Sequence, residues 1–191
     1  MTHDRDRRRP DVTAVEIVGG RTPLTVGLQA HDPAWAEAYA AHRERITAAL
    51  GGAAIVVEHI GSTSVPGLAA KPIVDIVVAV ADITAAEDHV ERLVAAGYEL
   101  RVREPGHRLV KTPARDVHVH VLEHGDPAVE AYLLLRDRLR TVPADRDLYE
   151  RTKRELMTRR WETMDAYADA KTEVIQGILG RAREARAARG D

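Results

Sequence analysis

The chain has 191 residues, of which 45% are hydrophobic and 30% charged, and its formal net charge at pH 7 is -2. This length suits one domain with a substantial core, and the near-zero charge argues against general nucleic-acid binding. Cysteine is absent, which excludes disulfides and thiolate metal sites and fits a cytoplasmic protein, and no segment approaches the roughly 20 apolar residues of a membrane span.

The first half of the chain is predicted to contain strands on either side of a well-marked helix. The helix is expected within residues 31–52. Asp32 can cap its first turn, Pro33 suits the first helical position, and Gly51 can end it. Strands are expected at 12–18, 24–28, 55–60 and 73–80.

The second half begins with another helix, in which Thr84 and Glu87 form a capping box and Gly97 provides the stop. Three further strands are expected at 98–103, 108–111 and 117–122, and the last of them alternates as V-H-V-H-V. Helices are expected at 126–140 and, after a break at Pro143, in one long region over 145–183.

This order of elements predicts an α+β, or mixed α/β, fold in which helices pack against one sheet. We expect residues 1–20 to form a flexible charged tail, residues 21–182 a single domain, and residues 183–191 a second flexible tail.

A Gly-Ser turn between two apolar runs, in the stretch "EHIGSTSVPGLAAKPIVDIVVAV", is the first candidate binding feature. A turn that leaves a strand exposes unpaired backbone N–H groups, and the hydroxyls of Ser62, Thr63 and Ser64 can join them around a phosphate. Gly61 allows close approach of the backbone because it has no side chain. By itself such a turn is a weak indication of phosphate binding.

Asp75 strengthens this interpretation because a carboxylate in an apolar strand is costly to bury unless it is paired, protonated or bound to a metal. Strand alternation places it on one face with Ile73, Val77 and Ala79. A carboxylate beside a phosphate-binding turn is the arrangement that holds Mg²⁺ against a nucleoside triphosphate. The alternative is an ion pair between Asp75 and Lys71 or an arginine.

The segment "VEHIGSTSVPGLAAKPIVDIVV" closely resembles the signature of the GrpB-like family, a branch of the nucleotidyltransferase-like superfamily. The likeness continues in "HDPAWAEAY", "VHVHVLE", "LRDRLR", "YERTKREL" and "YADAKTEVIQGIL", and so covers about residues 24–180. It implies a mixed sheet flanked by helices, with a C-terminal helical region and a nucleotide held at the Gly-Ser turn. Ser62 and Asp75 match the superfamily's Gly-Ser and first-carboxylate positions.

The sequence departs from the superfamily pattern at the second acid, whose position is occupied by Val77. The superfamily's third acid comes from a neighbouring strand, and the V-H-V-H-V strand offers His118, His120 and Glu123. Asp75 and Glu123 are therefore the candidate Mg²⁺ ligands, and two clamped metals are not expected from so few carboxylates.

His118 and His120 share one face of their strand, roughly 7 Å apart by the strand rise. Imidazoles at this spacing can ligate a metal, shuttle a proton or donate to phosphate oxygens, although plain packing also explains them. With Asp75 they are the candidate catalytic residues. Together with His59 they would form a nitrogen-rich site that suits a transition metal better than Mg²⁺.

The remaining candidates are basic residues and one further acid. The family has basic residues near the predicted hairpin that can meet a triphosphate tail, and a solvated hairpin explains them equally well. Residues on the C-terminal helices at family positions can face the cleft, although local salt bridges are the simpler account. The candidates of these kinds are Lys71, Arg108 and Lys111 for phosphate, with Lys153, Arg136, Lys171 and Glu58 as further possibilities.

Three functions remain open on the sequence. The leading hypothesis is a nucleotide-binding protein that transfers a nucleoside monophosphate from a triphosphate to a small-molecule acceptor, with Mg²⁺ as cofactor. The first alternative, favoured by Val77, is a non-catalytic nucleotide- or metabolite-binding module. The second is a metal-dependent hydrolase that uses the three histidines. Neither a membrane nor a nucleic acid is expected as a partner.

Overall fold

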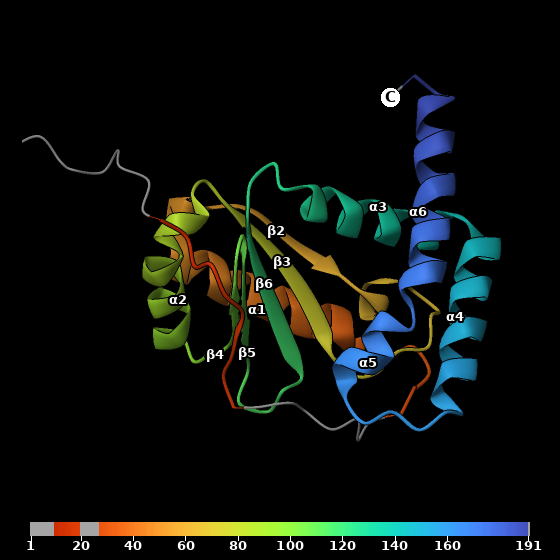
Figure 1. Ribbon diagram of the computed structural model, residues 1–191, viewed down its shortest axis with the longest axis horizontal. Coiled ribbons are helices and arrows are strands. Elements are labelled where there is room, and N and C mark those ends of the chain that lie inside the picture. The colour runs from red at the N-terminus through yellow and green to blue at the C-terminus, as the bar shows by residue number, and fades with distance from the viewer. Residues whose placement is uncertain (1–9, 20–26, 191) are drawn as a thin grey trace, which may run out of the picture.

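A computed structural model describes residues 10–19 and 27–190 of the protein, apart from the side chains of 86–88 and 164–165. The strands are β1 (Glu16–Ile17), β2 (Ala54–Ile60), β3 (Val74–Val80), β4 (Glu99–Glu104), β5 (His107–Lys111) and β6 (Val117–Glu123). The helices are α1 (Ala34–Leu50), α2 (Ala86–Ala95), α3 (Pro127–Thr141), α4 (Pro143–Met157), α5 (Met164–Asp169) and α6 (Thr172–Ala187). Short 3₁₀ turns are η1 (Gly51–Ala53), η2 (Ser62–Ser64) and η3 (Ile83–Ala85) (Figure 1).

The sheet is mixed, with the strand order β1-β4-β5-β6-β3-β2. Strands β3 and β6 are parallel, whereas the other neighbouring strands are antiparallel. On β3, Asp75 lies opposite Ile60 of β2 and His118 of β6. The predicted pairing of the two strands that flank the Gly-Ser turn is therefore confirmed, and it places Asp75 inside the sheet next to that turn.

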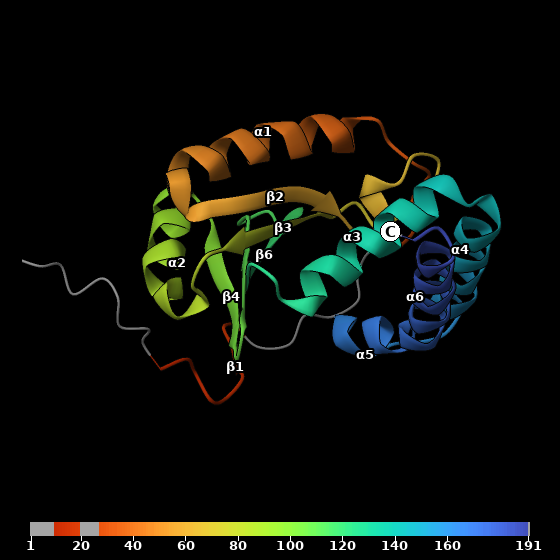
Figure 2. The same cartoon turned by 90° about the horizontal axis from the view of Figure 1, so that it is seen from above.

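Helices cover both faces of the sheet (Figures 1 and 2). The main core packs between one face and helices α1 and α2, and a smaller core packs between the other face and α3. Helices α4, α5 and α6 lie beyond the end of the sheet at which β2 finishes. A third apolar cluster joins the segment after β2 to α3, α4 and α6 through Val65, Leu68, Leu139, Tyr149 and Ile178. The predicted α+β fold with a C-terminal helical region is thus confirmed.

The alternation predicted for β3 is also confirmed. Val74, Ile76 and Val78 point into the core beneath α1 and α2, whereas Val77 and Ala79 point into the core beneath α3. Asp75 belongs to the same face as Val77 because side chains two residues apart on a strand share a face. It lies where the α3 core ends, so its carboxylate is only partly buried.

Local capping signals locate several helix ends correctly. The Asp32 carboxylate accepts a hydrogen bond from the Ala34 N–H, and α1 ends at Gly51, which has a φ of 56°. The capping box at Thr84 is not confirmed, because Thr84 lies within η3 and it is Asp82 that accepts its N–H; Glu87 lies outside the described side chains.

The C-terminal part of the chain differs most from prediction. The expected long helical region consists of three helices, and Pro143 starts α4 rather than only ending α3, since proline suits the first turn of a helix. Helix α6 includes residues 183–187, which the sequence assigned to the tail. The strand expected at 24–28 lies mostly outside the described residues. Among the described residues, no helix combines the length and apolar character of a membrane span.

Asp145 ties the C-terminal helices together. Its buried carboxylate accepts hydrogen bonds from Arg138 of α3 (2.6 Å) and Arg181 of α6 (2.5 Å). Burial raises the pKa of Asp145, but the two arginines outweigh it and hold the pKa below its ordinary 3.8. The pKa of Asp145 is lower in the folded state than in the unfolded state. Its ion pairs therefore stabilise the fold fully when the pH is above the ordinary pKa, and this stabilisation is lost as the pH falls through the folded-state pKa.

We expect Asp145→Asn to lower the free energy of unfolding by about 2 kcal/mol at pH 7, because it leaves two partly buried guanidinium groups without a carboxylate. The difference from the wild type should shrink at pH 3. Urea denaturation at both pH values would measure it. The matched control is Glu130→Gln, which breaks an exposed α3–α6 ion pair with Arg186 and should change stability by less than about 0.5 kcal/mol. Equal losses in the two variants would contradict a special role for Asp145.

Candidate functional site

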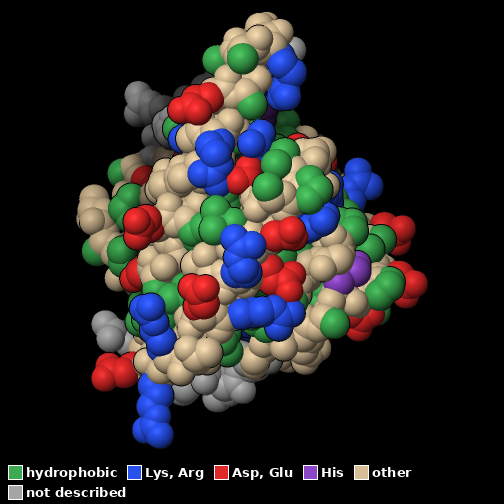
Figure 3. Space-filling model, turned by 90° about the vertical axis from the view of Figure 1, so that its right-hand side faces the viewer, with side chains coloured by type: hydrophobic (Ala, Val, Ile, Leu, Met, Phe, Trp, Pro, Cys, Tyr) green, Lys and Arg blue, Asp and Glu red, His purple; other side chains and the backbone are tan. Residues whose placement is uncertain are grey.

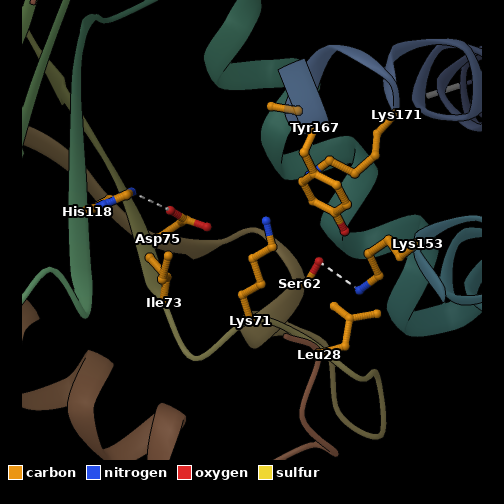
Figure 4. A pocket seen from close by; sticks show the side chains of 10 residues that line it. Leu28, Ser62, Lys71, Ile73, Asp75, His118, Lys153, Tyr167 and Lys171 are labelled. Carbon is orange, nitrogen blue, oxygen red and sulfur yellow. Dashed lines mark hydrogen bonds and ion pairs between the residues drawn. The ribbon is translucent and has the colours of Figure 1, made fainter. Parts of the chain in front are cut away.

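A cavity of about 140 Å³ lies between the end of the sheet and the C-terminal helices. Segments far apart in the sequence form its wall: the loop and turn between β2 and β3, the strands β3 and β6, helix α4, and the region of α5 (Figure 4). The lining residues are Leu28, Ser62, Lys71, Ile73, Asp75, His118, Lys153, Tyr167, Ala168 and Lys171. Asp75 and His118 lie on one side of the cavity, and Ser62, Tyr167, Lys153 and Lys171 lie on the other (Figure 4).

Lys153 is the most deeply buried of the charged residues in this wall, with 2% of its surface exposed. Its ammonium group donates to the Ser62 hydroxyl (3.1 Å) and to the carbonyl of Ala69. Burial, followed by the positive charge of Lys171, lowers the pKa of Lys153 to about 7. The group is therefore poised between its charged and neutral forms at physiological pH, and an anion in the cavity would favour the charged form.

Tyr167 supports the other two lysines. The Lys71 ammonium lies 3.5 Å from the centroid of the Tyr167 ring and the Lys171 ammonium 4.8 Å, both within the range of cation–π attraction. Burial, together with the charge of Lys171, lowers the pKa of Lys71 to about 8. Burial also raises the pKa of Tyr167 to about 12, so its hydroxyl is neutral.

The Tyr167 hydroxyl is buried and has no hydrogen-bond partner among the described residues. It points to the side of the cavity where Ser62 and Lys153 lie (Figure 4). Leaving a buried hydroxyl unpaired costs free energy, so native proteins usually provide a partner. An oxygen of a bound ligand would be such a partner.

Lysine is rare in this chain, and most of its lysines lie at the cavity. Lys and Arg together number 28, of which only four are lysine: Lys71, Lys111, Lys153 and Lys171. Three of these four line the cavity. On the outer face of the C-terminal helices, basic and acidic side chains alternate rather than forming a basic field (Figure 3). Lysine differs from arginine in that burial readily shifts its pKa and its ammonium is a compact donor. The scarcity of lysine was visible in the sequence and could have singled out the four residues, but not the convergence of three of them; Tyr167 gave no such signal.

Asp75 lies beside two imidazoles. Its Oδ1 is 3.6 Å from Nδ1 of His118 and 3.8 Å from Nε2 of His120. Burial raises the pKa of Asp75, but His120, His118 and Lys171 outweigh it and hold the pKa below the usual range. Burial lowers the pKa of His118 more than Asp75 raises it. The structure therefore brings together Asp75, His118 and His120, as the sequence predicted, around an ionised carboxylate.

The second ring nitrogen of His120 contacts another histidine. Its Nδ1 is 3.1 Å from Nε2 of His107, and Nδ1 of His107 is 2.6 Å from the Glu104 carboxylate. The two imidazole rings stack with their centroids 5.2 Å apart. This chain of contacts orients His120 toward Asp75 and leaves His118 as the histidine of the pair that lines the cavity.

The absence of a side chain at Gly61 makes room for the Asp75 carboxylate rather than for an approaching ligand. Its φ is 69° and its ψ is -172°, a region open essentially to glycine alone, and a Cβ atom there would lie 2.5 Å from Asp75 Oδ2. The space that the sequence assigned to a ligand is thus occupied by the carboxylate.

We expect Gly61→Ala to lower the free energy of unfolding by about 2–4 kcal/mol, through backbone strain and displacement of Asp75. Thermal and urea denaturation would measure it. Gly52→Ala is the matched control, because a Cβ atom at Gly52 would meet nothing within 4 Å. A Gly61→Ala protein as stable as this control would show that Asp75 moves freely.

The hydroxyls that follow Gly61 are divided between two roles. Ser62 faces the cavity, whereas Thr63 donates to the carbonyl of Ile73 and Ser64 donates to the carbonyl of Gly61. Thr63 and Ser64 are both buried, and their hydroxyls stabilise the turn. Of the three predicted phosphate-binding hydroxyls, only Ser62 is placed to contact a ligand.

The predicted three-histidine site is not formed. His59 is buried on the opposite face of the sheet from Asp75, since it lies one residue from Ile60, which faces the α3 core. Its ring stacks on Tyr39 at 4.8 Å and its Nε2 lies 3.1 Å from the Thr63 hydroxyl. Burial lowers the pKa of His59 to about 4, so it is a neutral core residue.

Glu123 does not join Asp75 either. In the parallel pair, Asp75 lies opposite His118 and Glu123 lies opposite Val80, five residues further along. At the rise of a strand this separation is about 16 Å. Glu123 instead accepts a hydrogen bond from the Ile83 N–H. The predicted pair of metal ligands is therefore wrong, because register places the two acids at opposite ends of neighbouring strands.

The remaining predicted residues have structural partners. Arg108 is buried and donates to Asp11 (2.6 Å), so it holds the N-terminal segment and does not line the cavity. The cavity lining does not include Lys111, Arg136 or Glu58 either. Lys111, opposite His118 on β5, lies 3.8 Å from Glu99, and Arg136 forms ion pairs of 2.7 Å with both Glu58 and Asp137.

The residues at this site do not fit a Mg²⁺ centre. Val77, at the position of the second acid, is fully buried in the α3 core. Mg²⁺ requires oxygen ligands in octahedral geometry, whereas the nearest donors around Asp75 are imidazole nitrogens. Among the described residues, no group of three or more His, Asp or Glu side chains is arranged to hold a metal ion. The predicted Mg²⁺ site therefore has no support in this arrangement of donors.

The chain is similar in sequence to one family model and to several relatives, and similar in fold to a solved structure. The family model described as GrpB protein matches residues 25–181. A UPF0157 protein of Streptomyces coelicolor is 63% identical, over 97% of this chain and 100% of its own length. The crystal structure of the conserved protein GrpB from Enterococcus faecalis is similar with a TM-score of 0.71 and 32% identity, covering 82% of this chain and 96% of the other. A dephospho-CoA kinase of Mycolicibacterium paratuberculosis is 31% identical, over 82% of this chain and 46% of the kinase.

Proposed function

The chain belongs to the GrpB protein family, and we propose that it binds a nucleotide by taking the terminal phosphates into the cavity lined by Lys71, Lys153 and Lys171. The observation that carries this proposal is the convergence of three of the four lysines on one small cavity. Three ammonium groups around one small cavity, with Lys153 buried and the other two partly buried, repel one another, and a phosphate would supply negative charge that offsets this repulsion.

Phosphate oxygens match the donors that the cavity offers. The three ammonium groups, the Ser62 hydroxyl and the unpartnered Tyr167 hydroxyl are all hydrogen-bond donors. Asp75 closes the opposite side (Figure 4), where its negative charge would repel phosphate and confine it to the lysines. The cavity wall thus has donors on one side and a negative charge on the other, which would fix the orientation of a bound anion.

The size of the cavity limits what enters it. Pockets that enclose a whole drug-sized ligand have volumes of about 300–1,000 Å³, and this one has about 140 Å³. It would accommodate the phosphate end of a nucleotide and leave the nucleoside outside. Discrimination between bases is therefore not expected from the lysine cavity.

Binding without transfer is the function that the geometry favours. Nucleotidyl transfer by two metal ions needs several carboxylates on one face. Here Val77 replaces the second acid, Glu123 is distant, and Glu58 on the neighbouring strand is paired with Arg136. The histidine hydrolase is disfavoured because His59 lies on the other face. The relative named a dephospho-CoA kinase supports phosphate-bearing nucleotides as the ligand class, although this chain matches less than half of that protein.

Isothermal titration calorimetry with ATP, ADP, AMP and adenosine tests the proposal. We expect affinity to fall in that order as phosphates are removed, with no measurable binding of adenosine. GTP, CTP and UTP should bind within about threefold of ATP because the base remains outside. Absence of ATP binding, or binding of adenosine as tight as that of ATP, would refute the proposal.

A further inference from the structure

We infer that this site takes the nucleotide triphosphate as the metal-free anion, so that Mg²⁺ competes with the protein for the ligand instead of assisting its binding. The inference rests on the proposed function, since it concerns the form of the ligand in the same cavity. It is carried by the positions of the cations and of the carboxylates around the cavity.

The lysines already supply the charge that a metal ion would bring. Three ammonium groups line one cavity of about 140 Å³, and when protonated they carry one positive charge more than Mg²⁺. Each ammonium offers three donors, and those of Lys153 are directed by the Ser62 hydroxyl and the Ala69 carbonyl. A divalent cation placed among them would be repelled by all three.

The carboxylates near the cavity are not available as a metal cage. Asp75 is the carboxylate that lines it, and its Oδ1 lies within 3.8 Å of two imidazoles. Glu150, close to Lys153, is occupied by Arg154 (2.6 Å) and the Ala69 N–H (3.1 Å). Mg²⁺ bound to ATP would therefore gain at most one carboxylate ligand from the cavity wall, while it covers phosphate oxygens that the lysines would otherwise contact.

The site should therefore prefer free ATP to its magnesium complex, whereas many enzymes bind the magnesium complex. Free ATP presents the larger negative charge and all of its terminal oxygens to the lysines. The magnesium complex presents a smaller charge and must lose water or ammonium contacts to enter. We expect free ATP to bind at least tenfold more tightly than its magnesium complex.

Calorimetric titration of ATP in EDTA and in excess Mg²⁺, at equal ionic strength, distinguishes the two forms of the ligand. The Asp75→Asn variant, checked for folding by circular dichroism, is the second arm. Tighter binding in EDTA, with a tenfold or larger weakening by Mg²⁺ in both the wild type and Asp75→Asn, is the expected result. Tighter binding with Mg²⁺, lost in Asp75→Asn, would overturn this inference and leave the proposed function standing. Absence of binding in both buffers would overturn the proposed function and this inference with it.

Discussion

Replacement of Lys153 by methionine should weaken ATP binding about 100-fold, the largest effect expected of any single side chain in the cavity. Lys153 has 2% of its surface exposed, so its contact with phosphate would be made away from water. A hydrogen bond to a charged group contributes about 1.5–3 kcal/mol, and breaking a buried charge pair costs about 3–5 kcal/mol. Methionine is unbranched and only one atom shorter than lysine, and it removes the charge and the donors.

Calorimetry on Lys153→Met should be compared with Arg151→Met, which removes an exposed positive charge from the same helix, α4. The control should retain wild-type affinity within about twofold, since exposed charges contribute little to a buried contact. The variant also leaves the Ala69 carbonyl without its lysine donor, so its stability should be measured separately by thermal denaturation. A folded Lys153→Met protein that binds ATP as tightly as the Arg151→Met control would remove Lys153 from the site.

Raising the pH from 6.5 to 9 should weaken ATP binding by at least about tenfold. In the free protein, burial holds the pKa of Lys153 at about 7 and that of Lys71 at about 8. A bound phosphate favours the ammonium forms and raises both values. Binding therefore takes up protons, and affinity falls as the pH passes through the pKa values of the free protein.

The other titrating groups of the cavity do not produce this trend. The pKa of Asp75 is depressed and the pKa of Tyr167 is raised to about 12, so the carboxylate stays ionised and the phenol neutral over this range. The pKa of His118 lies below its ordinary 6.5, which leaves it largely neutral. The last ionisation of a terminal phosphate, near pH 6, would strengthen binding slightly with rising pH and so opposes the effect.

Titrations at pH 7.5 in two buffers of different ionisation enthalpy give the number of protons taken up. We expect a positive number for the wild type and a smaller one for Lys153→Met. Constant affinity between pH 6.5 and 9, or release of protons on binding, would show that the two lysines do not contact the ligand.

The sequence by itself determined much of the local structure. Asp32 and Gly51 mark the ends of α1, and Asp126 caps α3, because caps depend on backbone geometry within a few residues. The alternation of side chains around Asp75 placed it on a defined face of β3, because alternation also depends only on neighbouring residues. Its nearness to Ser62 followed from the pairing of the two strands, which sets Ile60, two residues before Ser62, opposite Asp75.

Only the tertiary structure decided which distant residues meet. Lys71, Lys153 and Lys171 lie on a loop, on α4 and before α6, and no periodicity relates them. The parallel register of β3 and β6 separated Glu123 from Asp75, and the pleat of β2 turned His59 away from the site. The apolar cluster of Val65, Leu139 and Ile178 packs the segment after β2 against α3 and α6, and so holds the C-terminal helices beside the Gly-Ser turn. Contacts of this kind depend on how whole elements fill a common core, whereas capping and alternation depend on neighbouring residues alone.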